Sequence, residues 1–582
     1  MAARAVRPPE PPQPPGLDLW ASRRQTLQHS VDDAEVARLL AHQLKMAPHP
    51  EWRIPEDPTW LEDPFEDRNW CFQYHSLRWL EPLRRAAVKR NAPALEMWLH
   101  YMQDWTAKNP REGAASPWAW VDMADGLRAT QLCLAAPLVW RRANAHLPWI
   151  EAAIRDHAEH LADPDHMGNA NHALHQQEAL FICGRVLKEE RYWRLASQRM
   201  GSLLREQYDE QGMNAEGAPA YHHNNFIWWE KALRRFDLEQ LPRPEGADRH
   251  LHAPEQIAHA TRPDGTLVSI GDTDVLRPTK IDTPFTDYVT TDGAEGTAPS
   301  ETVAVYDAGY VFARSGWGDA QRPYSAQTYY TLRFGPARRV HGHPDGTSLT
   351  YSARGVNWIV DPGKFQYGNS TPRHHFVSRA GHSVLSVEGR KAFRDAFTEL
   401  SRHEIHEDHH DFLLEDLSVD RVELTRRVIY STGGEYLVVI DEAAARKKIT
   451  GVLRWQLGAD VNAEASDHQV DLTAAGERAA LWFDPAPLDL TTVRDQDDPF
   501  DGYVSVGWKK LAPATAVLVR RSGTRLRFVT VVAPGAGTAP EVRQLSEDGS
   551  PEITLEVSNG LARQRMMIDP ESVTITDLPS PS

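Results

Sequence analysis

Three short segments of the chain bring together amide, imidazole and phenol side chains, which are groups that bind anions or move protons. The first is HMGNANHALHQQEALF at 166–181, in which Asn171 and His172 stand where a helix is expected to begin. His175 follows three residues after His172, so both imidazoles share one face of that helix. A helix N-terminus offers free N–H groups and partial positive charge, which suits a bound carboxylate. The alternative is an ordinary helix cap with surface histidines.

The second segment is NAEGAPAYHHNNFIWWEKAL at 214–233, where a Gly- and Pro-containing turn delivers Tyr221 and His222 to a Trp-rich helix. A Tyr hydroxyl at such a junction can act as a general acid or base if cationic neighbours lower its pKa. The alternative is a buried Tyr whose hydroxyl only ties down the turn.

The third segment is RRVHGHPDGTSLTYSARGVNWIVDPGKFQYG at 338–368, in which a His-Gly-His-Pro-Asp-Gly turn leads into a strand. His343 in that turn, Asp361 at the end of the next strand and His382 in GHSVLSV offer two imidazoles and one carboxylate on neighbouring strands. Such a set could hold zinc, with a water or another group as the fourth ligand. The ligand spacings of 18 and 21 residues do not form a compact zinc motif, so the residues alone leave this open.

The elements that must position these residues change in kind along the chain. From about residue 80 to 240, amphipathic helices follow one another, separated by turn signals such as KNP, DPDHMGN and LPRPEG. From about residue 300, short alternating runs such as TYYTLRF, TSLTYSA, GVLRWQL and TAVLVRR are typical of antiparallel strands. We therefore expect paired helices followed by an antiparallel β-sandwich. The polar stretch 282–301 is the expected junction.

The size and charge of the chain limit its class. At 582 residues it is too long for one hydrophobic core, and no uncharged apolar run approaches the length of a membrane span. A net charge of -17 argues against nucleic acid or an anionic membrane as partner, because both require a broad basic face. It does not exclude an acidic glycan, because charges act within about 10 Å in salt and several Arg residues lie near the histidines.

Cysteine usage and the N-terminal segment favour a cytoplasmic location. Three widely spaced cysteines without a CxxC pair fit a reduced compartment. The first 20 residues are rich in Pro and lack the apolar stretch of an export signal, so we expect a disordered arm there.

Taken together, the three segments resemble the heparinase II/III-like polysaccharide lyases. The likeness covers roughly residues 80 to 570 and is carried by the Asn-His helix start, the EGxxxYH turn, RPDGTLVSIGDTD at 262–274, the HGHPDG turn, the VDPGKFQYG strand end and SRAGHSVLSV. It implies a multidomain α+β fold with an (α/α) toroid of helical hairpins at 21–300, including the linker, and an antiparallel β-sandwich at 301–575.

The resemblance also implies roles for individual residues. Asn171 and His172 match the positions that neutralise a uronate carboxylate in this family. Tyr221 resembles the tyrosine that protonates the leaving O4, and His341 resembles the second catalytic histidine. The implied reaction is cleavage of a uronate-containing acidic glycan by β-elimination, in which the carboxylate must be neutralised before a base can remove the C5 proton. The base is Tyr221 itself for elimination from one face, or one of the two histidines for elimination from opposite faces.

The remaining expectations concern metal and substrate. By the resemblance, His343, Asp361 and His382 match the ligands of a structural zinc, which would brace the turn that carries His341. The side chains expected to contact the acidic poly- or oligosaccharide are His175, His222, Arg339 and Arg379.

Three other functions remain open from the sequence. A glycoside hydrolase on a similar toroid would need two carboxylic acids about 5 to 9.5 Å apart. A non-catalytic protein could bind an acidic glycan with the same scaffold. A zinc hydrolase could use His341, His343 and Asp361. The acids available to the hydrolase are Glu178, Glu206, Asp209, Glu216 and Glu230.

Overall fold

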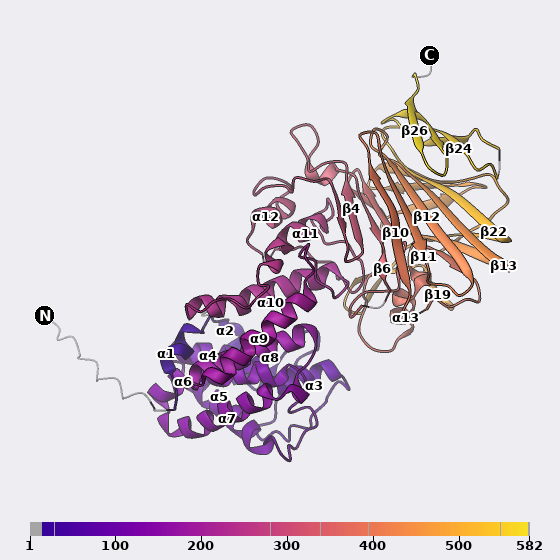
Figure 1. The fold of residues 1–582 in the computed structure, drawn as a ribbon. Helices are drawn as coiled ribbons and strands as arrows, with labels where there is room; N and C mark the ends of the chain where they lie inside the picture. The colour runs from indigo at the N-terminus through magenta and orange to yellow at the C-terminus, as the bar shows by residue number, and fades with distance from the viewer. Residues whose placement is uncertain are drawn as a thin grey trace. The chain divides into compact units, whose positions relative to one another are not determined.

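The computed structural model describes residues 14, 16–27, 30–279, 281–337, 339–393, 395–547 and 549–579. Within these residues the chain forms two compact units (Figure 1). The first unit takes the chain up to Gln207 together with Ile227–His250, and the second takes Tyr208–Phe226 together with the chain from Leu251 onward. Most of the expected arm at 1–20 lies outside the described residues. Leu17 is buried, however, and a helix begins at Leu19.

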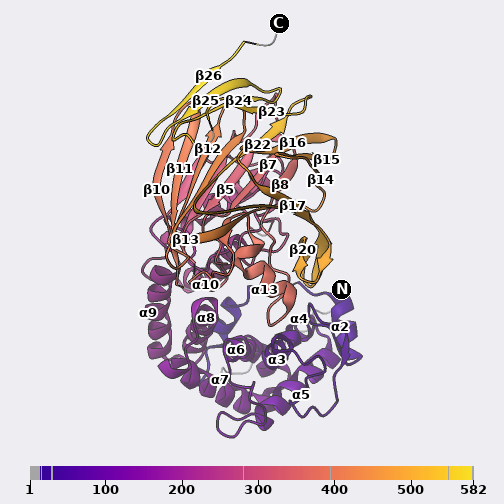
Figure 2. The same cartoon turned by 90° about the vertical axis from the view of Figure 1, so that its right-hand side faces the viewer.

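The first unit is helical. Figure 2 shows many of its helices, and neighbours in the sequence pack as pairs, such as α4 with α5 and α8 with α9. The helices are α1 (Leu19–Arg24), α2 (Asp33–Leu40), α3 (Arg68–His75), α4 (Glu81–Val88), α5 (Ala92–Lys108), α6 (Ala124–Arg142), α7 (Leu147–Ala162), α8 (Ala170–Val186), α9 (Glu190–Gln207) and, from Ile227 on, α10 (Pro219–Leu238). Short strands β1 (Gln43–Leu44) and β2 (Trp52–Arg53) form one small pair.

Local chemistry fixes where several of these helices begin. The side chains of Asp18, Asp32, Asp67 and Asn91 accept hydrogen bonds from first-turn amides of α1, α2, α3 and α5. Proline occupies the first turn of α4, α5 and α7, where its missing N–H costs no helical hydrogen bond. Among the described helices, none is both long enough and apolar enough to cross a membrane.

The second unit is built on two packed antiparallel sheets. The smaller sheet has the order β3-β4-β5-β7-β8. Its strands are β3 (Val303–Tyr306), β4 (Tyr310–Arg314), β5 (Tyr329–Arg333), β7 (Leu349–Ala353) and β8 (Val356–Ile359). Every residue of β4, β5 and β7 is buried, because this sheet is covered on both faces.

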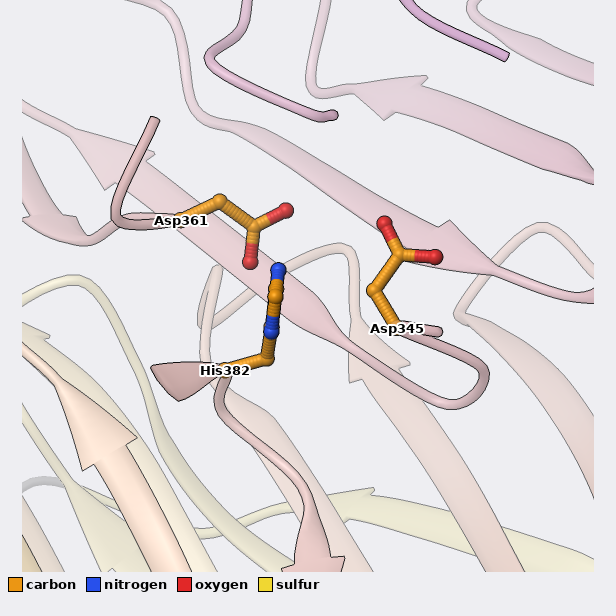
Figure 3. A group of neighbouring side chains, drawn as sticks. All are labelled: Asp345, Asp361 and His382. Carbon is orange, nitrogen blue, oxygen red and sulfur yellow. The ribbon is translucent and has the colours of Figure 1, made fainter. Parts of the chain in front are cut away.

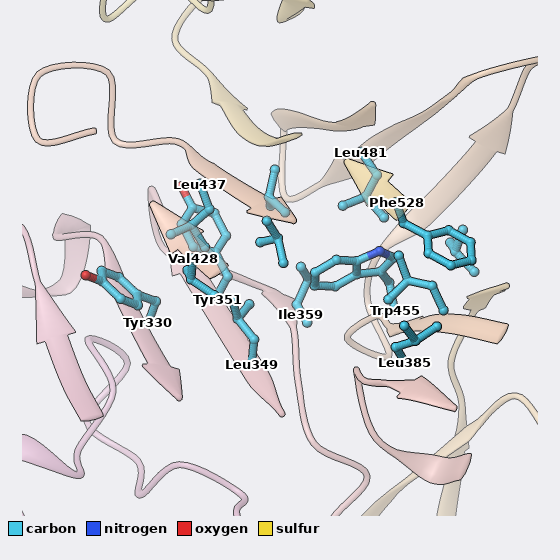
Figure 4. Packing of buried hydrophobic residues seen from close by; sticks show 14 of the residues in the cluster. Tyr330, Leu349, Tyr351, Ile359, Leu385, Val428, Leu437, Trp455, Leu481 and Phe528 are labelled. Carbon is cyan, nitrogen blue, oxygen red and sulfur yellow. The ribbon is translucent and has the colours of Figure 1, made fainter. Parts of the chain in front are cut away.

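The larger sheet has the order β14-β15-β16-β22-β13-β12-β11-β10-β6, and β17 and β9 pair with β22 and β13. Its strands are β6 (Gly335–Pro336), β9 (Leu385–Val387), β10 (Phe397–Ile405), β11 (His409–Asp416), β12 (Val422–Ser431), β13 (Leu437–Gln456), β14 (Asn462–Ala465), β15 (Gln469–Ala474), β16 (Glu477–Phe483), β17 (Asp489–Val493) and β22 (Ala516–Gly535). Side chains from both sheets, including Tyr330, Leu349, Val428 and Trp455, form one apolar core (Figure 4). The expected β-sandwich is therefore confirmed.

Smaller elements complete this unit. Four strands, β23 (Glu541–Gln544), β24 (Ile553–Ser558), β25 (Arg563–Ile568) and β26 (Val573–Asp577), form a third sheet that packs on the outer face of the large one. Two hairpins pair β18 (Gln496–Asp497) with β19 (Phe500–Asp501) and β20 (Tyr503–Gly507) with β21 (Lys510–Pro513). The helices of this unit are α11 (Ala253–His259), α12 (Pro284–Thr290), α13 (Thr371–Val377) and the first turns of α10.

The boundary between the units differs from the boundary expected at residue 300. Residues 251–300 belong to the second unit, because their backbone is bonded to its strands. The Arg314 guanidinium in β4 donates to the carbonyl oxygens of His259 and Thr261, at 3.0 and 3.1 Å. The Tyr324 hydroxyl donates to the same Thr261 oxygen at 3.0 Å. The predicted polar linker at 282–301 also contains helix α12.

Candidate active site

A buried carboxylate, Asp272, gathers the side chains of the HGHPDG turn within the second unit. Its Oδ2 lies 3.2 Å from His341 Nδ1, and its Oδ1 lies 3.1 Å from His343 Nε2. Arg373, in the first turn of α13, donates to both carboxylate oxygens, with its Nη2 at 3.1 Å from Oδ2. Burial raises the pKa of Asp272, but the three donors outweigh it and hold that pKa well below the ordinary value. Asp272 is therefore an anion that orients two imidazoles.

The backbone joins the three segments that meet here. The Asp272 N–H donates to the His341 carbonyl at 2.8 Å, and the His341 N–H donates to the Glu216 carbonyl at 2.8 Å. Gly271 has a φ of +58°, and a Cβ at that position would lie 2.7 Å from the His341 oxygen and 2.8 Å from the Gly217 oxygen. Only glycine allows this close approach, so the position of His341 depends on the 269–274 loop as well as on its own turn.

Tyr221 lies directly on His341. The two rings are stacked, with 3.4 Å between centroids and 8° between planes. The Tyr221 hydroxyl shares a hydrogen bond with the hydroxyl of Tyr367. Burial, reinforced by the carboxylates of Asp272 and Glu216, raises the pKa of Tyr221 to about 12. The pKa of Tyr221 is therefore raised, whereas the sequence interpretation required it to be lowered by cationic neighbours, and the phenol holds its proton at neutral pH.

Beside this cluster, the ligand atoms of Asp345, Asp361 and His382 lie within 4.8 Å of one another, and all three residues are buried. Figure 3 shows the Asp361 carboxylate facing a ring nitrogen of His382, with the Asp345 carboxylate beside them. Asp361 Oδ2 has no hydrogen-bond partner among the described residues. Burial and the neighbouring Asp345 raise the pKa of Asp361 to about 6. Two buried carboxylates and an imidazole fit a divalent cation, which would neutralise their charge.

The metal group overlaps the expected ligand set. Asp361 and His382 belong to both, and Asp345 is a carboxylate that the sequence did not suggest. His343 contacts Asp272 through Nε2, while its Nδ1 lies 3.2 Å from His382 Nε2, so its role as a metal ligand stays a prediction. His343 therefore lies between the metal group and Asp272.

In the helical unit, Asn171 and His172 lie in the first turn of α8, as the sequence predicts. Asn169 is the N-cap residue, although its side chain makes no capping hydrogen bond. His172 pairs with Asp122, and this contact lowers the pKa of Asp122 although burial opposes it. Asn171 is buried, whereas the His172 side chain is 40% exposed. The amide and the imidazole thus stand at one helix start.

His175 lies one turn further along α8, where it contacts other side chains of the helical unit. Its Nδ1 is 3.7 Å from Glu178 Oε2, and its ring packs edge-on to Trp228 at 5.4 Å. Glu178 also pairs with Arg235 Nε at 2.5 Å and with Lys231 Nζ at 3.2 Å. Burial raises the pKa of Glu178, but these cations hold it well below the ordinary value. Glu178 is therefore a structural anion and does not suit the proton-donating acid of a hydrolase.

Comparison with known proteins identifies the family. Residues 20–242 match the family described as heparinase II/III N-terminus, and residues 297–541 match the family described as heparinase II/III-like, C-terminal. The chain belongs to the heparinase II/III family. This family consists of polysaccharide lyases, so the enzyme class expected from the sequence is confirmed at the level of the family. No curated protein matches the sequence.

Solved structures agree on the fold. A crystal structure named heparinase III is 17% identical, with a TM-score of 0.77, and the match covers 97% of this chain and 93% of that chain. The heparan sulfate lyase HepC from Pedobacter heparinus is 18% identical, with a TM-score of 0.71, and the match covers 94% of this chain and 92% of that chain. At these identities the likeness establishes the fold alone, and it confirms the expected toroid followed by antiparallel sheets.

Two residues expected to contact the substrate of this heparinase II/III member are used inside the protein. His222 is buried; its Nδ1 accepts from the Asn214 N–H at 3.2 Å, and its Nε2 lies 3.3 Å from the Ala253 carbonyl. Arg379 pairs with Asp416 and donates to the Gly346 carbonyl at 3.1 Å. We therefore assign His222 to holding the Tyr221 turn. Arg379 holds the HGHPDG turn and also lines a cavity, so its contact with substrate stays a prediction.

Arg339 lines a cavity of about 1400 Å³ in the second unit, together with Arg379, Val340, Arg390 and Phe500. Burial lowers its pKa, and no carboxylate is bonded to it among the described residues. A cationic side chain that lines a large cavity keeps Arg339 as a candidate for contact with an acidic glycan.

Sequence reasoning missed four residues of the site: Asp272, Asp345, Tyr367 and Arg373. Asp272 and Asp345 stand inside quoted motifs, SIGDTD and HGHPDG, where an aspartate beside glycine also reads as an ordinary turn residue. Tyr367 in KFQYG carried no local signal, because its contact with Tyr221 spans 146 residues.

Proposed function

We propose that this heparinase II/III member cleaves a uronate-containing acidic glycan by β-elimination. The observation that supports this most is the stacked pair of Tyr221 and His341, in which a protonated phenol lies against an imidazole that a buried carboxylate orients. A phenol that keeps its proton is suited to donate it to a leaving oxygen.

In the proposed reaction, Asn171 and His172 neutralise the uronate carboxylate, so that the C5 proton becomes acidic enough to remove. A base takes that proton, the electron pair of the C5–H bond forms a C4–C5 double bond, and the C4–O4 bond breaks. Tyr221 gives its proton to O4. Because the resting phenol is protonated, the base in this scheme is a histidine. It is either His341, or His172 with the carboxylate then neutralised by Asn171 alone.

The proposed metal is zinc, held by Asp345, Asp361 and His382. Its contribution is to neutralise the buried carboxylates and to fix the turn that begins at His341, four residues before Asp345. None of the proton transfers passes through it.

The test is a set of acidic polysaccharides incubated with the purified protein and followed by the ultraviolet absorbance of an unsaturated uronate. Heparan sulfate is the first to try, since one similar structure is named a heparan sulfate lyase. Absorbance should rise with at least one uronate polymer. Cleavage without this absorbance would support the hydrolase instead, and binding without cleavage would support the non-catalytic alternative.

The Tyr221→Phe variant tests the assignment of the acid. Turnover should fall at least about 100-fold, the usual scale for one acid–base group, while substrate binding stays near that of the wild type. The matched control is Tyr288→Phe, because the Tyr288 hydroxyl donates to the Trp317 carbonyl away from the cluster. Equal turnover in wild type and Tyr221→Phe would remove Tyr221 from the mechanism.

A further inference from the structure

The helical unit contains a cavity of about 350 Å³ whose charge is opposite to that of the whole protein. Its lining contains Arg and Lys side chains and no acidic residue among the described residues, although the chain carries a net charge of -17. We call this cavity the basic pocket. Its cationic residues are Arg23, Arg84, Arg85, Lys89, Arg141 and Arg142.

The cations converge from three separate helices. Arg23 lies in the last turn of α1, Arg84 and Arg85 lie in α4 with Lys89 directly after it, and Arg141 and Arg142 end α6. Basic residues at helix C-termini complement the helix dipole, which accounts for these cations other than Arg84 on their own helices. The dipole does not account for three such ends lining one cavity.

A specific contact places α1 at this pocket. Pro137, inside α6, has no N–H and leaves the carbonyl of Cys133 without its helical partner. The Ser22 hydroxyl of α1 donates to that carbonyl at 2.5 Å. Since Pro137 also lines the pocket, the residue that frees this carbonyl for Ser22 is part of the pocket wall.

Around Arg84, Arg85, Lys89 and Arg142, the positive charge exceeds that of the carboxylates bonded to them among the described residues. Glu81 accepts from Arg84 at 2.5 and 2.6 Å and lies 3.4 Å from Arg85 Nε, so a single carboxylate serves two guanidinium groups. Arg142 donates to the Ala87 carbonyl at 2.8 Å rather than to an acid. In the part of the chain that the structure describes, the Lys89 ammonium has no ion-pair partner.

We propose that the basic pocket binds a tetrahedral oxyanion, namely a sulfate or phosphate group. Guanidinium and ammonium groups bind such anions through charge-assisted hydrogen bonds. Val88, Leu134 and Leu138 give the pocket an apolar side that can pack against a carbon skeleton attached to the anion. The anion is either a free ion or a sulfate group on a glycan, and the site does not depend on the proposed lyase reaction.

The test is calorimetric titration at low salt with sodium sulfate, sodium phosphate, and a sulfated disaccharide beside its unsulfated counterpart. The pocket variant is Lys89→Gln with Arg142→Gln. The matched control is Arg446→Gln with Lys447→Gln, which removes two exposed cations from β13. At least one sulfate or phosphate compound should bind to wild type and control, and at least about tenfold more weakly to the pocket variant, because two charge-assisted contacts are lost.

The two sources are separated by which compound loses affinity. If the pocket variant loses affinity only for inorganic sulfate or phosphate, the ligand is a free ion. If it loses affinity for the sulfated disaccharide, and the unsulfated disaccharide does not bind, the ligand is a sulfate group on a glycan. No binding to the wild type, or equal binding to wild type and pocket variant, would overturn the proposal. If the double variant fails to fold by circular dichroism, Lys89→Gln alone is titrated, because Lys89 is exposed and forms no ion pair with a described residue. Binding is measured without turnover, so failure here leaves the lyase proposal untouched.

Discussion

Asp272 is the residue on which the candidate active site depends most. It orients His341, contacts His343 and accepts from Arg373, so three donors share one carboxylate. Replacing it by asparagine keeps the shape and removes the charge. We expect Asp272→Asn to lower turnover at least about tenfold, because His341 loses the anion that fixes its ring. We also expect it to lower the free energy of unfolding by about 3 to 5 kcal/mol, the usual effect of breaking a buried ion pair.

The control for this variant lies two residues away. Asp274 pairs with Lys364 at 2.9 Å and is 40% exposed, so Asp274→Asn should change the free energy of unfolding by about 1 kcal/mol or less. Urea unfolding and steady-state turnover measure both effects. If the two variants had the same free energy of unfolding and the same turnover, Asp272 would not be the residue that organises the site.

The sequence predicts individual residues of the site better than their partners. Tyr221 and His341 stand out because motif and turn chemistry surround them, and the structure places their rings in contact. Their partners Asp272 and Tyr367 come from distant loops, and pairing over such separations leaves no periodic or local signal. That Asn171 and His172 contact the same substrate as Tyr221 and His341 stays a prediction. His222 has the residue type of a binding group but is buried, and burial is a property of the fold rather than of the motif.

At the scale of elements, the HGHPDG turn carries two tasks within five residues. It begins with His341 beside Tyr221 and continues to Asp345 in the metal group, which also includes the end of the next strand at Asp361. We expect bound zinc to stabilise the second unit by about 4 kcal/mol when its concentration is a thousandfold above Kd. A chelator should therefore lower the melting temperature of the wild type.

The variant His382→Ala should lower the melting temperature without the chelator and make it insensitive to the chelator. His403→Ala is the matched control, because His403 is exposed on β10 and lies outside the metal group. Calorimetric melting and elemental analysis of the purified protein measure the two properties. Absence of bound metal after exposure to zinc, together with an unchanged melting temperature, would exclude the metal site.

Element types follow from periodicity, whereas their grouping into units does not. Helical spacing and strand alternation predict the change from helices to sheets, because side-chain burial follows the period of each element. Residues 251–300 group with the second unit because long-range contacts hold them there, such as Arg314 with the carbonyls of 259 and 261. Polar composition at 282–301 predicts a linker, but Thr283 caps α12 there and makes it an ordered part of the second unit.

At the scale of the whole molecule, buried neutral histidines occur in both units. Burial lowers the pKa of His75 in the helical unit to about 3, and the pKa values of His222 and His259 in the second unit to about 4 and 3. The His222 contacts match a neutral ring, because Nδ1 accepts from one backbone group while Nε2 meets a carbonyl. Protonation would break the first contact and place charge in the interior.

These pKa values set the acid limit of stability. An unfolded histidine has a pKa near 6.5, so each depressed pKa contributes stability that is fully present above about pH 6.5 and is lost as the pH falls toward the folded pKa. For His222 the loss reaches about 3 kcal/mol by pH 4, at about 1.4 kcal/mol per pKa unit. Carboxylates with lowered pKa values, such as Asp272, lose their contribution only below about pH 4. Urea unfolding should therefore show falling stability in both units between pH 6.5 and 4.5. His222→Gln should flatten this slope for the second unit, and an unchanged slope would mean that His222 is not the neutral, buried group described above.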